Sequence, residues 1–532
     1  MNLQKLKKVA FWVLLPAVFA YSVHVRSENM QMPMSRHHEW ISAHTLLTLK
    51  IWEKEGIANH YFSPVYAFSN PGDIGSNFLG GVVDQNNRGY YVSYPPFAFI
   101  LPYVVFRVMQ VPMDHHSLQW FSLAIHFCVA FTLLLIINLL SGRRLGDGLF
   151  IPSFAAYGAY LFMPGALWFH SNVYFCDTLV QMFFVLLVYL YLLMYKAQKI
   201  SKWLLTSFGL CVFAAVYTEW LGLFVAFSLF ICTAVLCFKN RQKYMPVAIA
   251  IALCTTLPLL TTVWQYAQIS GFDNLIETSA EKYANRSGHS KADISDHGLN
   301  DSNPYSIPIL KQHYETSYGP FFPLIRFSAI LLALVLASQY LRKRENAADS
   351  LLLVVTGVML PIALHHFVFY NFTVVHDFST LKTGVPIALL LGLVVAKLQE
   401  VVSAFNKSAG LAVALSLTAY FYFVYVTKGV EKYLEVNNPK NASVYFALCG
   451  TIARKYISPD EVVFARVVSP EMLYYTERNV VKAGNLQEAT AALNGHMMAK
   501  KGVFIDIENF ESPTVKRLVR INAVGDSVDV KL

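Results

Sequence analysis

Long uninterrupted apolar runs are the feature that most constrains how this chain can fold. Residues 118–140 and 220–238 are examples, and similar runs recur throughout residues 1–430. About 17 to 25 apolar residues match the hydrocarbon core of a bilayer, where backbone groups must be satisfied within a helix. Only 14% of the residues are charged, against about 25% in typical soluble chains. The sequence therefore predicts a polytopic membrane protein made mainly of α-helices.

Basic clusters between the apolar runs set the predicted topology. Cytoplasmic loops carry an excess of Lys and Arg, so the basic start of the chain puts the N-terminus in the cytoplasm. Keeping all six basic clusters on that side requires about eleven spans. It also makes residues 97–112, which are short and contain Pro102 and Arg107, an interfacial helix on the outer surface. The predicted spans are residues 9–25, 118–140, 148–168, 173–195, 203–218, 220–238, 245–264, 323–341, 350–370, 379–398 and 409–427.

Three polar regions then lie on the outer side. Two are the loops 26–95 and 265–322, and the third is the tail. The tail alternates helix-like stretches with β-like runs such as VVFARV, GVFIDI and SVDVKL, which is typical of an α/β domain. We therefore expect a transmembrane domain over residues 1–430 and a small α/β domain over residues 431–532. The first would lie in the inner (plasma) membrane, and the second on its periplasmic or extracellular side.

Charge and cysteine usage exclude two classes of protein. The net charge is +9, but the basic residues sit in short clusters between apolar runs, which favours topology control over nucleic-acid binding. The seven cysteines form no CxxC pair, and most lie inside apolar runs. We interpret them as small buried hydrophobes, with no disulfide or metal framework.

Several polar side chains near the outer face are candidates for a functional site. The first loop contains Arg36-His37-His38-Glu39, followed by an amphipathic stretch expected to lie in the membrane interface. Glu39 reads either as a helix N-terminal acid or as a general base held at the membrane surface. Further along, the segment from Gly89 to Phe97 brings Tyr91 and Tyr94 to the headgroup level. There they serve either as an aromatic belt or as substrate contacts.

Ionisable residues within or beside the later spans form a second set of candidates. Asp177 lies inside an apolar run, where an unpaired carboxylate is costly. Glu219 is either a solvated turn residue or part of the site. Arg326 either extends its side chain to the membrane surface or binds phosphate. The remaining candidates are His170, His365, His366, His376, Asp377 and Lys382. His365, His366, His376 and Asp377 offer metal ligands, but their spacing is irregular. We therefore expect phosphate binding and assign no metal site, leaving a divalent metal as an open alternative.

The order of these features resembles a known family. The chain resembles the GT-C fold glycosyltransferases in the order of five features. These are a first span, an outer loop with an acidic residue, a helix ending in WEKEG, a Tyr-Pro-Pro segment, and an Asp at the start of a later span. The bacterial members akin to protein O-mannosyltransferases and the lipid A aminoarabinose transferase are the most similar in pattern. The resemblance covers residues 1–430, and the tail resembles the periplasmic domain appended to many members.

The resemblance implies a site and a reaction. Glu39 takes the place of the family's catalytic acid, although His38 precedes it where the family usually has Asp. Tyr94 stands where a basic residue usually precedes Pro-Pro, and Asp177 matches a second acidic position. The implied reaction is inverting sugar transfer from a polyprenyl-phosphate donor to an acceptor hydroxyl of a glycan, lipid or protein. Glu39 and Asp177 would be catalytic. The expected substrate-binding residues are His37, His38, Tyr91, Tyr94, His170, Glu219, Arg326, His366, His376, Asp377 and Lys382.

Proteins of other classes share some of these features. A transporter would place ionisable residues near the membrane midplane and show repeated halves, neither of which the sequence suggests. A flippase or a polymerase of lipid-linked sugars shares the outer polar loops and stays open as an alternative.

Overall fold

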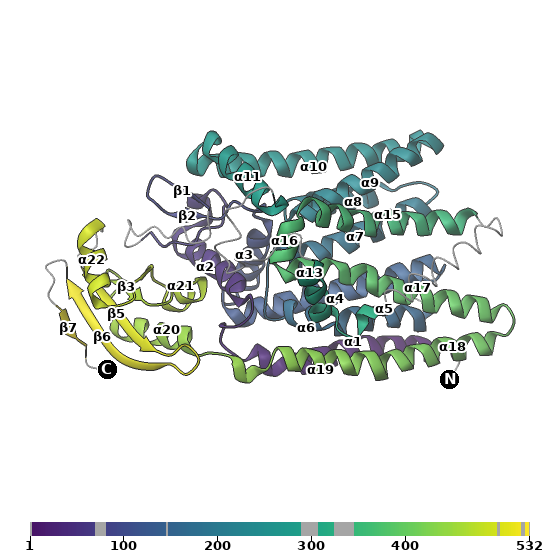
Figure 1. Cartoon of the computed structure of the whole chain (residues 1–532). Helices are drawn as coiled ribbons and strands as arrows, with labels where there is room; N and C mark the ends of the chain where they lie inside the picture. The colour runs from purple at the N-terminus through teal and green to yellow at the C-terminus, as the bar shows by residue number, and fades with distance from the viewer. Residues whose placement is uncertain are drawn as a thin grey trace.

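The computed structural model describes residues 3–69, 81–144, 147–288, 307–323, 345–496, 501–522 and 527–530. Long helices form a bundle, and a small domain with a sheet caps one end of it (Figure 1). The chain is thus mainly α with a C-terminal α/β domain, which confirms the predicted fold class. Arg326 and nearly all of the predicted span 323–341 lie outside the described residues.

Apolar helices build the bundle. Seven segments in the described part of the chain are long and apolar enough to cross a membrane, and three shorter apolar helices accompany them. Apart from 323–341, every predicted span falls on a helix in this part of the chain. The apolar helices are α1 (Leu3–Met30), α3 (Phe97–Met109), α4 (His115–Leu140), α5 (Ile151–Phe162), α6 (Pro164–Phe169), α7 (Cys176–Lys196), α8 (Lys202–Val216), α9 (Trp220–Lys239), α10 (Arg241–Ser270), α15 (Glu345–Val368), α17 (Gly384–Ser403) and α18 (Lys407–Tyr420). Of these, α3 corresponds to the predicted interfacial helix over residues 97–112 and not to a predicted span.

The second polar region is more helical than its composition suggests. At 30 residues, α10 is about 45 Å long, which exceeds the hydrocarbon thickness, so it carries the chain beyond the predicted end of its span. It is followed by α11 (Phe272–Ser287), and α13 (Ile307–Tyr318) precedes the next undescribed segment. Closer to α17, the short helix α16 (Tyr370–Val375) and the 3₁₀ segment η3 (Asp377–Thr383) turn the chain between two long helices.

The helix of the first loop, α2 (Glu39–Glu55), is buried, contrary to the predicted interfacial position. Most side chains between Glu39 and Trp52 are inaccessible to solvent. The reason is that α2 has apolar residues on more than one face. Leu46, Leu47 and Leu49 point in different directions around the helix, and all three are buried. Downstream lie η1 (Ile57–His60) and a small antiparallel pair, β1 (Val82–Val83) with β2 (Gly89–Tyr90).

The C-terminal domain follows α18 through a π-helical segment, η4 (Phe421–Val426), and α19 (Thr427–Val436). Its five-stranded sheet has the order β4-β3-β5-β6-β7, in which β3 is parallel to β4 and β5 and the other pairs are antiparallel. The predicted helices and strands of the tail are present. The elements are η5 (Pro439–Asn441), α20 (Tyr445–Tyr456), β3 (Val462–Ala465), α21 (Pro470–Thr476), β4 (Val480–Lys482), α22 (Leu486–His496), β5 (Lys501–Glu508), β6 (Thr514–Asn522) and β7 (Ser527–Asp529).

The C-terminal domain docks directly onto the first loop. Helix α21 packs against α2 (Figure 1). The hydroxyl of Tyr475 accepts a hydrogen bond from the backbone N–H of Met34 at 2.9 Å. Lys50 and Lys54 each donate to the carboxylate of Glu477, at 2.5 and 2.6 Å. The loop that carries residues 35–39 is therefore held between the bundle and the domain.

Candidate functional site

Two adjacent histidines and an aspartate from a distant part of the chain converge beside the first loop. His37 Nε2 lies 2.8 Å from Asp377 Oδ2, and His38 Nε2 lies 2.9 Å from Asp377 Oδ1. Asp377 is supplied by the start of η3, and its side chain is largely buried, whereas that of His37 is 56% exposed. Burial lowers the pKa of His38 below its usual value, although the hydrogen bond to Asp377 acts in the opposite direction. We call His37, His38 and Asp377 the histidine–aspartate group.

Glu39, the predicted catalytic acid, is fully buried and accepts four hydrogen bonds. Its Oε2 accepts from the backbone N–H groups of Ser35 and Arg36, at 2.9 and 2.8 Å. Its Oε1 accepts from Arg36 Nη2 at 3.2 Å and from Asn172 Nδ2 at 2.9 Å. The carboxylate thus ties the first loop to the turn before α7, on which Asp177 lies.

A second cluster of charged groups is buried between α7, α9, α15 and η3. Lys382 Nζ lies 3.5 Å from Asp177 Oδ1 and 3.1 Å from His365 Nε2. His365 Nε2 in turn lies 3.2 Å from Glu219 Oε1, and Glu219 Oε2 accepts from the backbone N–H of Leu221. We call Asp177, Glu219, His365 and Lys382 the buried ion network. Because η3 carries both Asp377 and Lys382, it joins this network to the histidine–aspartate group.

Two cations of α11 cover the Tyr-Pro-Pro segment, and the sequence analysis did not select them. Lys282 Nζ donates to Ser93 Oγ at 2.6 Å, and Arg286 Nη1 donates to the backbone carbonyl of Ser93 at 3.1 Å. The guanidinium of Arg286 lies 4.4 Å from the ring centroid of Tyr94. The available signal was the spacing of Lys282 and Arg286, which puts them on one face of a helix. The polar composition of residues 265–322 favours a loop over a helix, so the composition alone does not reveal this signal.

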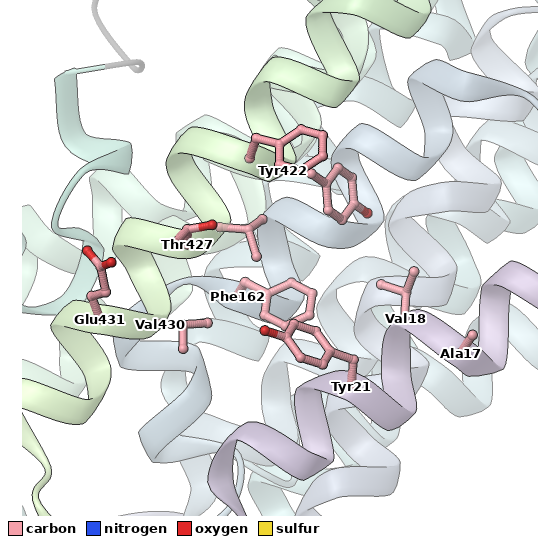
Figure 2. Close-up of a pocket in the computed structure, with 10 residues that line it drawn as sticks. Ala17, Val18, Tyr21, Phe162, Tyr422, Thr427, Val430 and Glu431 are labelled. Carbon is pink, nitrogen blue, oxygen red and sulfur yellow. The ribbon is translucent and has the colours of Figure 1, made fainter.

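Two apolar hollows and one smaller hollow lie on the described part of the chain, and two of the three are lined by residues of the site. A hollow of about 310 Å³, the α10–α11 hollow, is lined by Val92, Tyr94, Trp220, Thr262, Val263, Tyr266, Phe272, Leu275, Ile276 and Ser279. A hollow of about 460 Å³, the α1–α19 hollow, lies between α1 and the segment from η4 to α19 (Figure 2). It is lined mainly by apolar side chains such as Val18, Phe162 and Val430, with Glu431 at one end. A third, smaller hollow opens beside His37 and Asp377 and is also lined by Trp168, Ser317 and Asn437.

Not every predicted residue joins these groups. His170 is buried, and its Nε2 lies 2.9 Å from the hydroxyl of Tyr160. His366 Nε2 lies 2.9 Å from the hydroxyl of Tyr314. His376 stacks on Phe378, and its ring centroid lies 6.4 Å from that of His38. These three residues flank the site, whereas Arg326 lies outside the described residues.

The residues that could hold a metal ion also differ from the candidates that the sequence offered. His365 and His366 are adjacent in the sequence, but their ring nitrogens face different partners, Lys382 and Tyr314. Among the described residues, the histidine–aspartate group offers three donor atoms that all lie within 4.8 Å of one another. Two imidazoles and a carboxylate are a suitable set for a divalent metal of the zinc class.

Solved structures share the fold of this chain. No protein-family model and no curated protein matches it. The archaeal oligosaccharyltransferase AglB from Archaeoglobus fulgidus, solved with an inhibitory peptide and a dolichol-phosphate, is similar with a TM-score of 0.56 and 10% identity, over 93% of this chain and 69% of AglB. ArnT from Cupriavidus metallidurans, bound to undecaprenyl phosphate, is similar with a TM-score of 0.56 and 11% identity, over 95% of this chain and 96% of ArnT.

A further structure of the Archaeoglobus fulgidus oligosaccharyltransferase, in complex with Zn and sulfate, gives a TM-score of 0.53 and 11% identity, over 92% of this chain and 67% of that one. These similarities extend over nearly the whole chain, including both the bundle and the C-terminal domain. At such identities they establish the architecture. The chain therefore has the GT-C fold of integral membrane glycosyltransferases, as its sequence resemblance implied.

Proposed function

We propose that this protein is a glycosyltransferase that moves a sugar from a polyprenyl-phosphate donor to an acceptor hydroxyl at the membrane surface. The observation that carries the proposal is the convergence of Asp177, Lys382 and Asp377 at one end of a bundle of apolar helices. Buried ionisable groups are costly in such surroundings and mark a function. ArnT and AglB, which share the fold, were solved with polyprenyl-type phosphates. We assign the site to the exoplasmic face, as the positive-inside pattern predicts.

The donor would bind with its tail in the apolar α10–α11 hollow and its phosphate near the cations. Lys282 and Arg286 lie over Ser93 and Tyr94, and Tyr94 also lines this hollow. Lys382 supplies a buried positive charge deeper in the site. An amphiphile with an apolar chain and an anionic head matches this combination, because guanidinium and ammonium groups donate charge-assisted hydrogen bonds to phosphate.

Asp177 is the carboxylate best suited to accept the acceptor's proton. Glu39 accepts four hydrogen bonds, and each oxygen of Asp377 has a histidine partner. Among the described residues, the Asp177 carboxylate in contrast has only the 3.5 Å contact with Lys382 and a 3.6 Å contact with the thiol of Cys176 as hydrogen-bonding partners. We therefore propose Asp177 as the base and Glu39 as the residue that positions the loop. The catalytic role of Glu39 stays a prediction.

In the proposed reaction the acceptor oxygen attacks the anomeric carbon while the bond from that carbon to the phosphate oxygen breaks. The phosphate leaves with the electron pair, and Lys382 and Arg286 stabilise its growing charge. The acceptor proton passes to the Asp177 carboxylate. Because the Asp177 side chain is only 3% exposed, the substrate must displace the side chains that cover it. A divalent metal held by the histidine–aspartate group would add positive charge beside the phosphate.

The test begins with a strain lacking this protein. Mass spectrometry of its envelope glycans and lipids should reveal a missing sugar mass, and the deletion strain's lipid extract then serves as the acceptor for purified protein. With a labelled undecaprenyl-phosphate sugar as donor, Asp177→Asn should lower transfer by about 100-fold or more. Asp273→Asn changes an exposed acid of α11 and should leave the rate unchanged. Full transfer by Asp177→Asn, or an unchanged sugar profile in the deletion strain, would refute the proposal.

A further inference from the structure

We propose that His37, His38 and Asp377 form a binding site for one divalent transition-metal ion of the zinc class. Only the role of the ion in catalysis rests on the proposed function. Binding of the ion to the protein is measured without any sugar substrate. His37 and His38 come from the first loop and Asp377 from η3, 340 residues further along the chain. An ion at this position would therefore join the two segments that frame the site.

The donor atoms are already arranged around a common point. Both histidines present Nε2 to the carboxylate, each to a different oxygen, at 2.8 and 2.9 Å. All three donor groups lie within 4.8 Å of one another. Zinc takes imidazole nitrogen and carboxylate oxygen at about 2.0–2.2 Å, which in a tetrahedral site separates ligands by about 3.3 Å. The two nitrogen–oxygen separations of 2.8 and 2.9 Å lie within about 0.5 Å of that spacing.

The ligand types select the class of metal. Imidazole suits zinc and its first-row neighbours, whereas magnesium and calcium prefer sets of oxygen ligands. Three protein ligands leave a fourth position of a tetrahedral ion open for water or a substrate oxygen. Two imidazoles from adjacent positions of one loop meet the Asp377 carboxylate, and two imidazoles with one carboxylate are a ligand set typical of zinc.

The backbone of the first loop is shaped to place both rings on the same side. His38 has φ 59, in the left-handed region that non-glycine residues seldom adopt. Such strain persists where the surroundings over-determine it, and it clusters at functional sites. Here the backbone carbonyl of His37 accepts from Trp168 Nε1 at 3.2 Å, and Glu39 binds the preceding N–H groups. The result is a close pair of imidazoles, with ring centroids 4.0 Å apart.

Access and charge agree with this assignment. The exposed ring of His37 and the carboxylate of Asp377 both line the small hollow beside Trp168 and Ser317, which gives an ion a route to the donors. Arg36, the nearest guanidinium in sequence, is engaged by Glu39 and Asn29. Lys382 lies five residues after Asp377 on η3, and it is turned toward Asp177. A bound ion would add charge to the phosphate-binding side of the proposed transfer site.

The experiment measures metal directly on the full chain. The protein is purified with a tag that contains no histidine, stripped with a chelator, and titrated with Zn²⁺, Co²⁺ and Mg²⁺ alone. Elemental analysis after dialysis should give one Zn²⁺ per chain, Co²⁺ should show the visible absorption of a tetrahedral site, and Mg²⁺ should not compete. Asp377→Ala and His38→Gln should each weaken Zn²⁺ binding at least about tenfold. His116→Ala, an exposed histidine on α4, should not.

His38→Gln keeps a hydrogen-bond donor for Asp377 while removing the ligand, so it separates metal binding from the ion pair. Size-exclusion profiles establish that the variants are folded. A stripped protein that binds no Zn²⁺, or variants that bind it as tightly as the wild type, would overturn the site. Such a result leaves the sugar-transfer assay unaffected. Conversely, Zn²⁺ binding without sugar transfer would refute the proposed function while supporting the metal site.

Discussion

The four hydrogen bonds of Glu39 lead to a prediction at the scale of single residues. In Glu39→Gln an amide NH₂ replaces one carboxylate oxygen and faces N–H donors wherever it points, so at least one buried donor loses its partner. Each such loss costs about 1–3 kcal/mol. We expect both transfer and the midpoint of thermal unfolding in detergent to fall, and Asn172→Ala, which removes the donor to Oε1, to reproduce part of both effects. Lost transfer with an unchanged unfolding midpoint would instead support Glu39 as the base.

The kinds of residue in the site were predictable from the sequence, but their partners were not. Asp177 and Lys382 stood out because ionisable groups in apolar runs need a reason to be there. Nothing in the sequence indicates that Asp377 meets His37 and His38, because the contact spans 340 residues. Arg286 could not be selected in this way, because it lies in a polar segment of the sequence. A basic residue in such a segment is usually a solvated surface group.

At the scale of elements, α11 gives the next prediction. Its Arg286 lies over Tyr94, beside the apolar α10–α11 hollow. Arg286→Met keeps much of the apolar stem but removes the charge. We expect the dissociation constant for undecaprenyl phosphate alone, measured by native mass spectrometry, to rise about tenfold, since one charge-assisted contact is worth about 1.4 kcal/mol or more.

Two controls test whether the charge of Arg286 acts on the phosphate. Binding of undecaprenol, which has the same tail without the phosphate, should be unaffected by Arg286→Met. Arg241→Met removes an exposed cation from the opposite end of α10 and should leave both affinities unchanged. Equal weakening for the phosphate and the alcohol would assign Arg286 to packing.

Helical periodicity predicted α2 correctly but not its surroundings. Its polar side chains Lys50 and Lys54 suggested an exposed face, yet both donate to Glu477 of the C-terminal domain. The sequence shows that one face of the helix is polar, but it does not show whether that face contacts water or a charged residue of another segment. In the same way, the apolar content of α10 indicated a span, while its full length followed only from the structure.

At the scale of the whole molecule, the C-terminal domain braces the loop that carries the site. Helix α21 packs on α2, and the hydroxyl of Tyr475 and the carboxylate of Glu477 bind the first loop and its helix. The tail was predicted as an α/β domain, but its docking could not be predicted from a single sequence. The contacts join segments more than 400 residues apart, so the sequence carries no local signal for them.

The buried carboxylate of Glu471, on the helix that packs against α2, leads to a prediction about pH. It is 4% exposed, and its Oε2 has no hydrogen-bond partner among the described residues. Burial raises the pKa of Glu471 from 4.5 to about 7. The folded state therefore binds a proton more readily than the unfolded state, so the contribution to stability is fully present below about pH 4.5 and is lost as the pH rises to about 7. We expect the unfolding midpoint to decrease between pH 5 and pH 8 in the wild type, and Glu471→Gln to remove most of that decrease, raising the midpoint at pH 8 by several degrees.

Glu477 supplies the matched control, because it lies at the interface with α2 and its pKa is shifted in the opposite direction. Partial burial acts to raise the pKa of Glu477, but the hydrogen bonds from Lys50 and Lys54 hold it at about 2. It is ionised throughout the range from pH 5 to pH 8. Glu477→Gln should therefore lower the unfolding midpoint by a similar amount at both pH values, through the loss of its two lysine partners, and leave the slope unchanged. Parallel pH profiles for the wild type and Glu471→Gln would show that Glu471 does not titrate with docking, whereas a changed slope in Glu477→Gln would assign the dependence to the lysine pair.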